Sequence, residues 1–132
     1  MIVVDANVFV SLLVAADAHH ERCVAWLRAQ LSAGEMLVAP AILLPEVGGA
    51  ISRRAAPDAG REAMAALKRI RALRLVPVDA KLAGLAAELA VAHGLRGADA
   101  VYAAVADSLD ISLVTLDADF RRVAGRIEIV AP

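Results

Sequence analysis

Cysteine, aromatic residues and any surplus of charge are all scarce in this sequence. Cys23 is the only cysteine, which excludes an internal disulfide and suits a reducing compartment. Aromatic residues make up 3% of the 132 residues although 60% are hydrophobic, so the core must consist of Leu, Val, Ile and Ala. Acidic and basic residues number 15 and 14, so the charge of the whole molecule does not by itself indicate a nucleic-acid binder.

Long apolar runs are also missing. The longest stretches without charge, residues 6–16 and 36–45, are well short of the roughly 20 residues that span a bilayer. No basic segment precedes the first apolar run and Asp5 follows it closely, so we expect no signal peptide. The length suits one domain, residues 1–132, and we expect a cytoplasmic protein with no membrane partner.

Short apolar segments alternate with segments of helical periodicity. This order is typical of βαβ units and predicts a three-layer α/β/α sandwich with a central parallel sheet of four to five strands. We expect strands at residues 2–4, 36–39, 75–78, 111–116 and 127–130. We expect helices at residues 8–16, 20–31, 41–54, 58–73, 80–93, 98–109 and 117–123. Pro77 places the third strand at an edge of the sheet, because proline cannot donate to a neighbouring strand.

Several residues suggest how the helices begin and pack. Asn7 and Asp79 stand where a side chain can cap the helices that follow them. Gly48 and Gly49 lie inside the expected helix 41–54, where each glycine costs about 1 kcal/mol against alanine. Such a pair would also let another element approach that helix closely.

Four acidic residues fall where parallel strands or their following helices meet the same edge of the sheet. Asp5 and Asp117 each end a strand, Glu46 comes early in a helix, and Asp99 opens another helix. Like charges in one cleft raise each other's pKa, and a bound divalent cation would remove that conflict. All-oxygen ligands favour Mg²⁺, with Mn²⁺ as the other candidate.

Some of the acids also have a purely structural explanation. Asp99 would stabilise the dipole of its helix, Asp117 could cap the next one, and Asp119 could simply be solvated. Asp5 and Glu46 are harder to explain in this way, because apolar residues surround both. The histidines do not fall at strand ends beside these acids, so we expect none of them to be a metal ligand; they are His19, His20 and His93.

Four segments together resemble the PIN-domain ribonucleases, and the compact chain is similar to the VapC-like toxins of bacterial toxin-antitoxin pairs. The resemblance covers essentially the whole chain. It rests on Ile2-Val3-Val4-Asp5-Ala6-Asn7, on Leu44-Pro45-Glu46-Val47 with Arg53 downstream, on Gly97-Ala98-Asp99-Ala100-Val101-Tyr102-Ala103-Ala104, and on Leu113-Val114-Thr115-Leu116-Asp117-Ala118-Asp119-Phe120.

This resemblance implies a metal-dependent endoribonuclease. Its acidic site would consist of Asp5, Glu46, Asp99 and Asp117, with Asn7 and Thr115 as polar supports and Asp119 as an auxiliary acid. Asp5 and Asp99 would hold Mg²⁺ directly, and the ion would activate water against an RNA phosphodiester. The basic residues nearest the acids in sequence would hold the RNA backbone, although solvated helix faces explain them equally well: Arg53, Arg54, Arg96 and Arg121.

The resemblance also implies partners, namely a second copy of the chain and a small antitoxin whose tail enters the cleft. The apolar faces of residues 8–16 and 41–51 would supply such an interface. Two alternatives stay open: a PIN nuclease of RNA processing, and a catalytically silent PIN-like binding module. A dehalogenase-type phosphatase would need an aspartate where Asn7 stands, and a response-regulator receiver would need a lysine after a late strand, where the chain has none.

Overall fold

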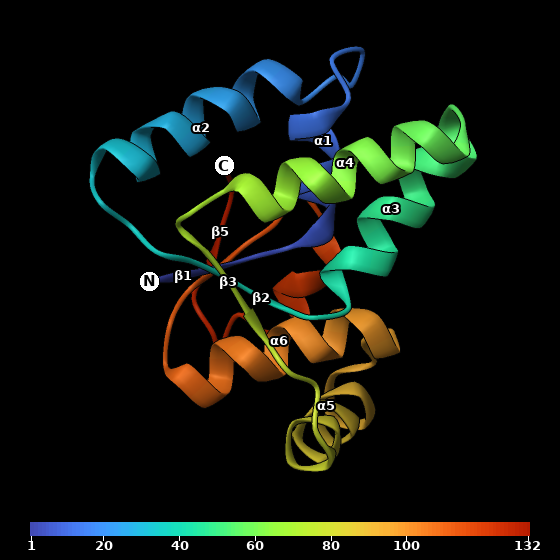
Figure 1. Ribbon diagram of the computed structural model, residues 1–132. Coiled ribbons are helices and arrows are strands. Elements are labelled where there is room, and N and C mark those ends of the chain that lie inside the picture. The colour runs from blue at the N-terminus through green and yellow to red at the C-terminus, as the bar shows by residue number, and fades with distance from the viewer.

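Five short parallel strands form the central sheet of the computed structural model, which describes residues 1–132 (Figure 1). The strands are β1 (Ile2–Val4), β2 (Leu37–Pro40), β3 (Leu73–Val76), β4 (Leu113–Val114) and β5 (Ile129–Val130). Their order across the sheet is β3-β2-β1-β4-β5, and every neighbouring pair is parallel. The predicted parallel sheet is therefore confirmed, and β3 lies at an edge as expected, although Pro77 comes just after its last residue, Val76.

Helices cover both faces of the sheet, which gives the expected three layers. Figure 1 shows α1 to α4 on one side and α5 and α6 on the other. α6 packs directly on β1 and β2, and α5 packs on the outside of α6. The helices are α1 (Ala6–Leu13), α2 (His20–Ser32), α3 (Leu43–Arg54), α4 (Pro57–Arg69), α5 (Ala80–His93) and α6 (Gly97–Leu109), followed by the 3₁₀ helix η1 (Ala118–Val123).

The core is mainly aliphatic, as the composition predicted, although three of the four aromatic residues are also buried in it, namely Phe9, Tyr102 and Phe120. Val3, Val4 and Leu113 are fully buried, because strands of a doubly covered parallel sheet have no solvent-facing side. α6 buries Ala103 and Ala104 toward the sheet, and such small side chains let the helix backbone come close. The fold thus needs few aromatic residues.

Several boundaries differ from those predicted: α1 begins at Ala6, and β4 and β5 are limited to Leu113–Val114 and Ile129–Val130. α4 ends at Arg69 and β3 already begins at Leu73, although helical spacing assigned Leu73 to the helix. Leu73 pairs in register with Leu37 of β2, and this sheet pairing outweighs the helical pattern. Asp79 does cap α5, since its carboxylate accepts a 2.8 Å hydrogen bond from the backbone N–H of Leu82.

Helices α3 and α4 approach closely at two glycines. A Cβ added to Gly48 would lie 3.0 Å from Sδ of Met64, and one added to Gly60 would lie 2.0 Å from Oγ of Ser52 and 2.7 Å from the carbonyl oxygen of Gly48. The close approach expected at Gly48 is therefore confirmed. Gly60, on the facing helix, is the tighter of the two positions.

We expect Gly60→Ala to destabilise the protein by about 1–3 kcal/mol, because the new methyl group forces α3 and α4 apart. Gly84→Ala is the matched control, since a Cβ there would meet nothing within 4 Å in the middle of α5. That substitution should stabilise the protein by up to about 1 kcal/mol. Urea unfolding measures both effects, and equal stabilities for the two variants would refute the close helix contact.

The expected apolar surplus on residues 8–16 and 41–51 is mostly buried within the chain. α1 packs against α2 and α3, and α3 packs against α4, so Val8, Phe9 and Val47 are fully covered. The large hydrophobic side chains that remain exposed lie elsewhere, at Met1, Leu31, Leu75, Val91 and Leu109. No helix combines the length and apolar character needed to cross a membrane.

Candidate active site

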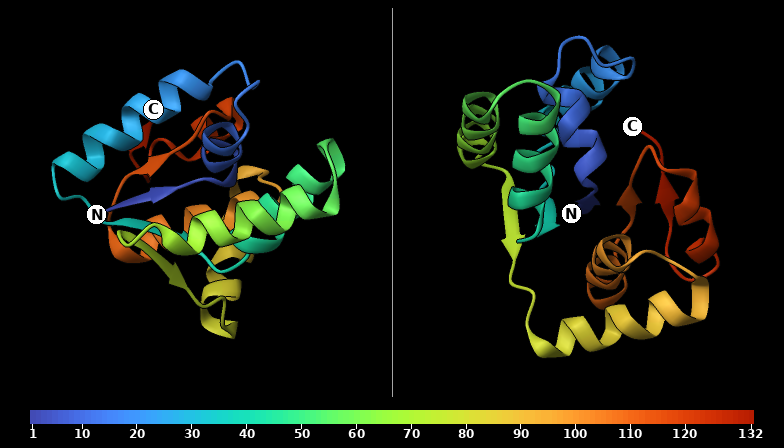
Figure 2. Two further views of the ribbon diagram at one scale, coloured as in Figure 1. Left: turned by 45° about the horizontal axis from the view of Figure 1, so that its top comes forward. Right: turned by 90° about the vertical axis from the view of Figure 1, so that its right-hand side faces the viewer.

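The carboxyl ends of β1 and β4 meet where the strand order reverses. From β1 the chain builds β2 and β3 toward one edge and then returns to add β4 and β5 on the other side. In open parallel sheets, ligands bind at this topological switch point, outside the carboxyl ends of the strands. The right-hand view of Figure 2 looks toward that end of the sheet.

All four acids singled out in the sequence line one cleft at this edge. The cleft has a volume of about 450 Å³ and is lined by Asp5, Glu46, Asp99 and Asp117, together with Asn7, Arg53 and Arg54. Each acid comes from a different element: the end of β1, the first turn of α3, the first turn of α6 and the residue that precedes η1. Parallel crossovers thus bring together acids that are up to 112 positions apart in the sequence.

A small hydrogen-bond network fixes Asp5, which is only 5% exposed. Thr115 Oγ1 donates to Oδ2 of Asp5 at 2.7 Å and accepts from Nδ2 of Asn7 at 3.1 Å. The backbone N–H of Asp117 also donates to Thr115 Oγ1, at 2.9 Å. The hydroxyl of Thr115 therefore ties β1, α1 and the end of β4 together around the buried carboxylate.

Asn7 does not cap the first helix, contrary to our prediction. α1 already begins at Ala6, so Asn7 lies within its first turn. Its Oδ1 instead accepts from the backbone N–H of Leu116 at 3.2 Å, and its Nδ2 donates to Thr115. The backbone N–H of Leu116 and the hydroxyl of Thr115 lie just beyond the end of β4 and need hydrogen-bond partners, which Asn7 provides.

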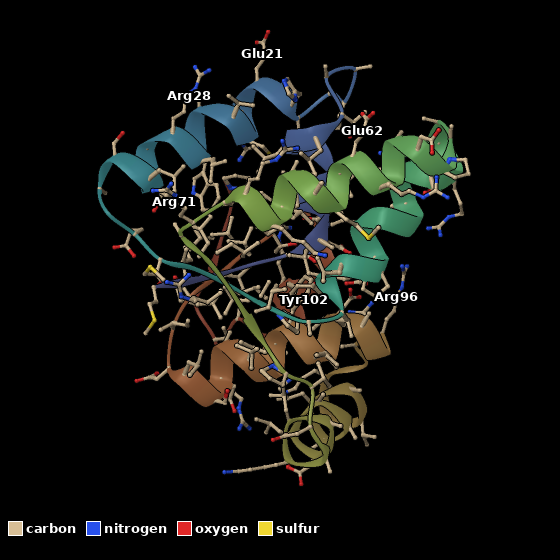
Figure 3. All side chains as sticks on the ribbon, viewed as in Figure 1. Glu21, Arg28, Glu62, Arg71, Arg96 and Tyr102 are labelled. Atoms are coloured by element: carbon tan, nitrogen blue, oxygen red, sulfur yellow. The ribbon has the colours of Figure 1, made fainter.

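Glu46 is oriented by Tyr102, a residue whose part in the site we did not predict. The buried Tyr102 hydroxyl donates to Oε2 of Glu46 at 2.7 Å, and Figure 3 shows Tyr102 between α6 and the elements above it. Burial, followed by the bond to Glu46, raises the pKa of Tyr102 above its usual range, so the phenol remains a donor. Tyr102 lies three positions after Asp99 on the same helix face, which is the signal that would have revealed it.

Three of the four acids have raised pKa values. Burial is the main cause for Asp5, and the charges of Asp99 and Glu46 add to it, so that the pKa of Asp5 rises to about 7. Burial also raises the pKa of Glu46, assisted by Asp99. Burial and the neighbouring charges of Asp117 and Asp119 raise the pKa of Asp99, while Arg96 opposes them. The cleft therefore carries a surplus of negative charge, because five acids line it with two arginines.

Asp117 and Asp119 have local bonds of the kind we considered as alternatives to function. Asp117 caps η1, because its Oδ1 accepts from the backbone N–H of Asp119 at 2.8 Å. Asp119 does not line the cleft, and its carboxylate lies 3.6 Å from a guanidinium nitrogen of Arg122. Capping uses one oxygen of Asp117 and leaves the other available to the cleft.

The four arginines proposed for the RNA backbone separate into two groups. Arg53 and Arg54, at the end of α3, line the cleft. Arg96 and Arg121 do not, although Arg96 extends from the start of α6 at the same side of the molecule (Figure 3) and lowers the pKa of Asp99 by its charge.

The loop between α1 and α2 also reaches the cleft, which the sequence did not lead us to expect. Ser11, Asp17 and His19 line it. Ser11 Oγ donates to Oδ1 of Asp17 at 2.9 Å, and Arg54 lies 3.7 Å from the other oxygen of Asp17. Ser11 follows Asn7 by one helical turn, but the placement of Asp17 and His19 depends on the path of the loop.

The donor set suits a hard divalent cation, although the side chains are not gathered into a complete cage. No group of three or more His, Cys, Asp or Glu side chains is arranged to hold a metal ion. The cleft instead offers carboxylate oxygens from four elements, with Arg53 and Arg54 as its two arginines. Mg²⁺ is commonly held by one or two carboxylates and keeps several waters, so this arrangement fits it.

A three-layer α/β/α fold with an acidic cleft at the carboxyl edge of its parallel sheet defines the class of protein. The family model of the PIN domain matches residues 2–126, and the chain belongs to that family. Its fold is that of the VapC toxins. No curated protein matches the chain in sequence.

Solved structures agree with this assignment over the whole chain. VapC20 of Mycobacterium tuberculosis, a toxin that cleaves the sarcin-ricin loop, superposes with a TM-score of 0.79 and 28% identity over 100% of both chains. FitAcB from Neisseria gonorrhoeae gives 0.74 and 23% identity over 98% of this chain and 96% of the other. DNA-bound VapBC from Salmonella typhimurium gives 0.72 and 20% over the same shares, 98% and 96%. The last two likenesses concern the fold alone.

We expect Tyr102→Phe to lower the rate of any reaction that uses Glu46, while leaving substrate affinity within about twofold. The Tyr102 hydroxyl lowers the pKa of Glu46, so its loss should raise that pKa further and move the acidic limb of the pH–rate profile to higher pH. Kinetics over a pH series measure this shift. Glu46→Gln is the control, since adding Tyr102→Phe to it should move nothing, and an unchanged profile in Tyr102→Phe alone would contradict the positioning role.

Proposed function

We propose that the protein is a metal-dependent endoribonuclease that hydrolyses RNA phosphodiester bonds, and that it acts as the toxin of a toxin-antitoxin pair. The observation that carries this proposal is the convergence of Asp5, Glu46, Asp99 and Asp117 on one cleft of a PIN domain. The 28% identity to an RNA-cleaving VapC toxin over the full length supports the substrate class.

Asp5 and Asp99 would hold Mg²⁺, or Mn²⁺ in its place. Bound there, the ion would lower the pKa of a water molecule and neutralise charge on the phosphate. Thr115 and Asn7 keep Asp5 in one orientation, so little rearrangement accompanies binding. Asp119, outside the cleft, would be an auxiliary acid that adds to the negative field at Asp99.

Glu46 and Asp117 would act through water at the edges of the site. The Tyr102 hydroxyl occupies Oε2 of Glu46 and leaves Oε1 to orient or deprotonate a water. Capping η1 likewise leaves Asp117 one oxygen, which would accept a hydrogen bond from a water on the ion. Arg53 and Arg54 would hold the RNA backbone at the mouth of the cleft, with Arg96 and Arg121 beyond it.

A small antitoxin and a second copy of the chain are the proposed protein partners. Several similar structures are toxin-antitoxin complexes, including VapBC from Salmonella typhimurium and VapBC2 from Rickettsia felis, both bound to DNA. Because most of the apolar surface expected at residues 8–16 and 41–51 is buried within the chain, a dimer would use their half-buried side chains. Light scattering at micromolar concentration would distinguish a dimer from a monomer.

The test is cleavage of structured and single-stranded RNA by the purified chain in Mg²⁺, in Mn²⁺ and in EDTA. Cleavage in either metal and none in EDTA is the expected result. Calorimetric titration with Mg²⁺ in the same buffer separates a nuclease from a silent PIN-like module, which would bind neither the ion nor RNA productively. Absence of cleavage together with absence of metal binding would overturn the proposal. Growth arrest on expression, relieved by a neighbouring gene, would favour a toxin over a processing nuclease.

A further inference from the structure

A second groove adjoins the acidic cleft beside β4 and β5. Its volume is about 360 Å³, and His19, Leu116 and Asp117 line both the groove and the cleft. The two depressions therefore adjoin, with Asp117 among the residues between them. The groove is thus next to the acidic site.

The groove has an apolar floor and basic walls. Ile129 and Val130 of β5 contribute to the floor, while Arg22 of α2 and Arg121 of η1 contribute the positive charge. Asp117 is the only acidic residue that lines it. In the cleft, by contrast, five acids gather with two arginines.

Neither Arg22 nor Arg121 forms an ion pair with an acidic side chain. Arg121 has no ion-pair partner or side-chain hydrogen bond, unlike Arg122 beside it, which is 3.6 Å from Asp119 and donates to the carbonyl oxygen of Gly94. Arg22 donates through Nε to the main-chain oxygen of Pro132, the last residue of the sequence, and faces no acidic side chain within ion-pair distance. Both side chains are exposed, so an anion can reach them from solvent.

We propose that this groove binds the nucleotide next to the scissile phosphate of a single-stranded RNA. The base lies on the apolar floor, and Arg22 and Arg121 hold the adjoining phosphate. Only an unpaired nucleotide can turn its base into such a groove, and guanidinium planes can stack on bases where exposed aromatic residues are missing. The inference rests on the proposed function, because the acidic cleft must receive the neighbouring phosphate.

Equilibrium binding of a fluorescent RNA hairpin with a single-stranded loop tests the groove separately from catalysis. Fluorescence anisotropy is measured at low salt in EDTA, so that no metal-dependent cleavage occurs. Arg22→Ala and Arg121→Ala should each weaken binding about three- to tenfold and reduce the slope of log K against log salt by about 0.7. Arg28→Ala removes the same charge from the same helix as Arg22, but its side chain points away from the sheet (Figure 3) and should have little effect.

A second measurement asks whether a base occupies the groove. An abasic nucleotide is placed at each loop position in turn, and one position should weaken binding to the wild type. Ala131→Trp fills the groove without changing its charge, at an exposed residue where folding should tolerate it, and should abolish that dependence.

The outcomes distinguish this inference from the proposed function. Equal binding by the groove variants and Arg28→Ala, or an abasic scan without effect, would overturn the groove assignment even if the protein cleaves RNA. Conversely, groove-dependent RNA binding without cleavage in Mg²⁺ or Mn²⁺ would support the groove assignment and refute the proposed nuclease activity. Groove variants that no longer bind a co-expressed antitoxin but keep full RNA affinity would show that the groove binds protein and not RNA.

Discussion

The Asp99→Asn variant is expected to lose RNA cleavage by about a thousandfold or more while remaining folded. Asp99 lines the cleft from the first turn of α6, and its charge is one of those that disfavour an ionised Asp5. Asparagine keeps the shape of the side chain but removes the negative charge on which a divalent ion depends. Single-turnover cleavage of a mapped RNA site in Mg²⁺ measures the loss.

Thermal unfolding of the same variant separates catalysis from folding. Asp99→Asn relieves repulsion from Asp117 and Asp119 but gives up a favourable acid at a helix N-terminus, so its stability should stay within about 1 kcal/mol of the wild type or exceed it. Asp110→Asn is the matched control, because it removes a charge from the other end of α6, where the left-handed backbone (φ 52°) accepts asparagine well. Undiminished cleavage by Asp99→Asn would refute the assignment of Asp99 to the metal.

Stability without metal is expected to fall as the pH rises from about 4 to 7. The pKa of Asp5 is about 7 in the folded protein against an ordinary 3.8, so between these values the folded state holds a proton that the unfolded state has lost. The free energy of unfolding then falls by about 1.4 kcal/mol per pH unit, up to about 4 kcal/mol above pH 7. Asp17 and Asp107 have lowered pKa values and act in the opposite direction, with stability lost only as the pH falls through their folded-state values.

Urea unfolding in EDTA over a pH series measures this slope, and Asp5→Asn is the comparison that isolates it. Asparagine cannot ionise, and its amide oxygen can still accept from Thr115, so the variant should show a flatter profile and be the more stable protein at pH 8. Saturating Mg²⁺ should stabilise the wild type at pH 8, by about 2.7 kcal/mol at 100 times the dissociation constant, and have little effect on Asp5→Asn. Parallel pH profiles for the two proteins would show that Asp5 is not the group responsible.

Much of the fold could be predicted from local sequence patterns. The alternation of strands and helices predicted the three layers, and helix α5 has the predicted boundaries with Asp79 as its cap. A predicted boundary was wrong where pairing with a strand distant in the sequence determined it. The spacing of Leu73 fits a helix, but Leu73 pairs with Leu37 of β2. The residues around Leu73 do not indicate this pairing.

The candidate site divides in the same way. An acid that follows an apolar strand is visible in the sequence, and one edge of a parallel sheet collects such acids, so the four carboxylates could be named in advance. Of the partners of these acids, Asn7 and Thr115 were named only through the family resemblance, and Tyr102 was not named as one. Tyr102 reaches Glu46 across 56 positions, and Asn7 reaches Thr115 across 108, because packing of α6 and α1 against the sheet brings them within hydrogen-bond distance.

The sequence by itself determined the parallel α/β/α architecture, the aliphatic core and the four acids, since each follows from residue type and from spacing over a few positions. Only the tertiary structure decided that Asp5 is buried enough to hold a proton near neutral pH, that the α1–α2 loop brings His19 to the cleft, and that Arg22 and Arg121 share a groove beside it. Burial and electrostatic fields depend on what the fold places around a group, and that surrounding comes from segments far away in the chain.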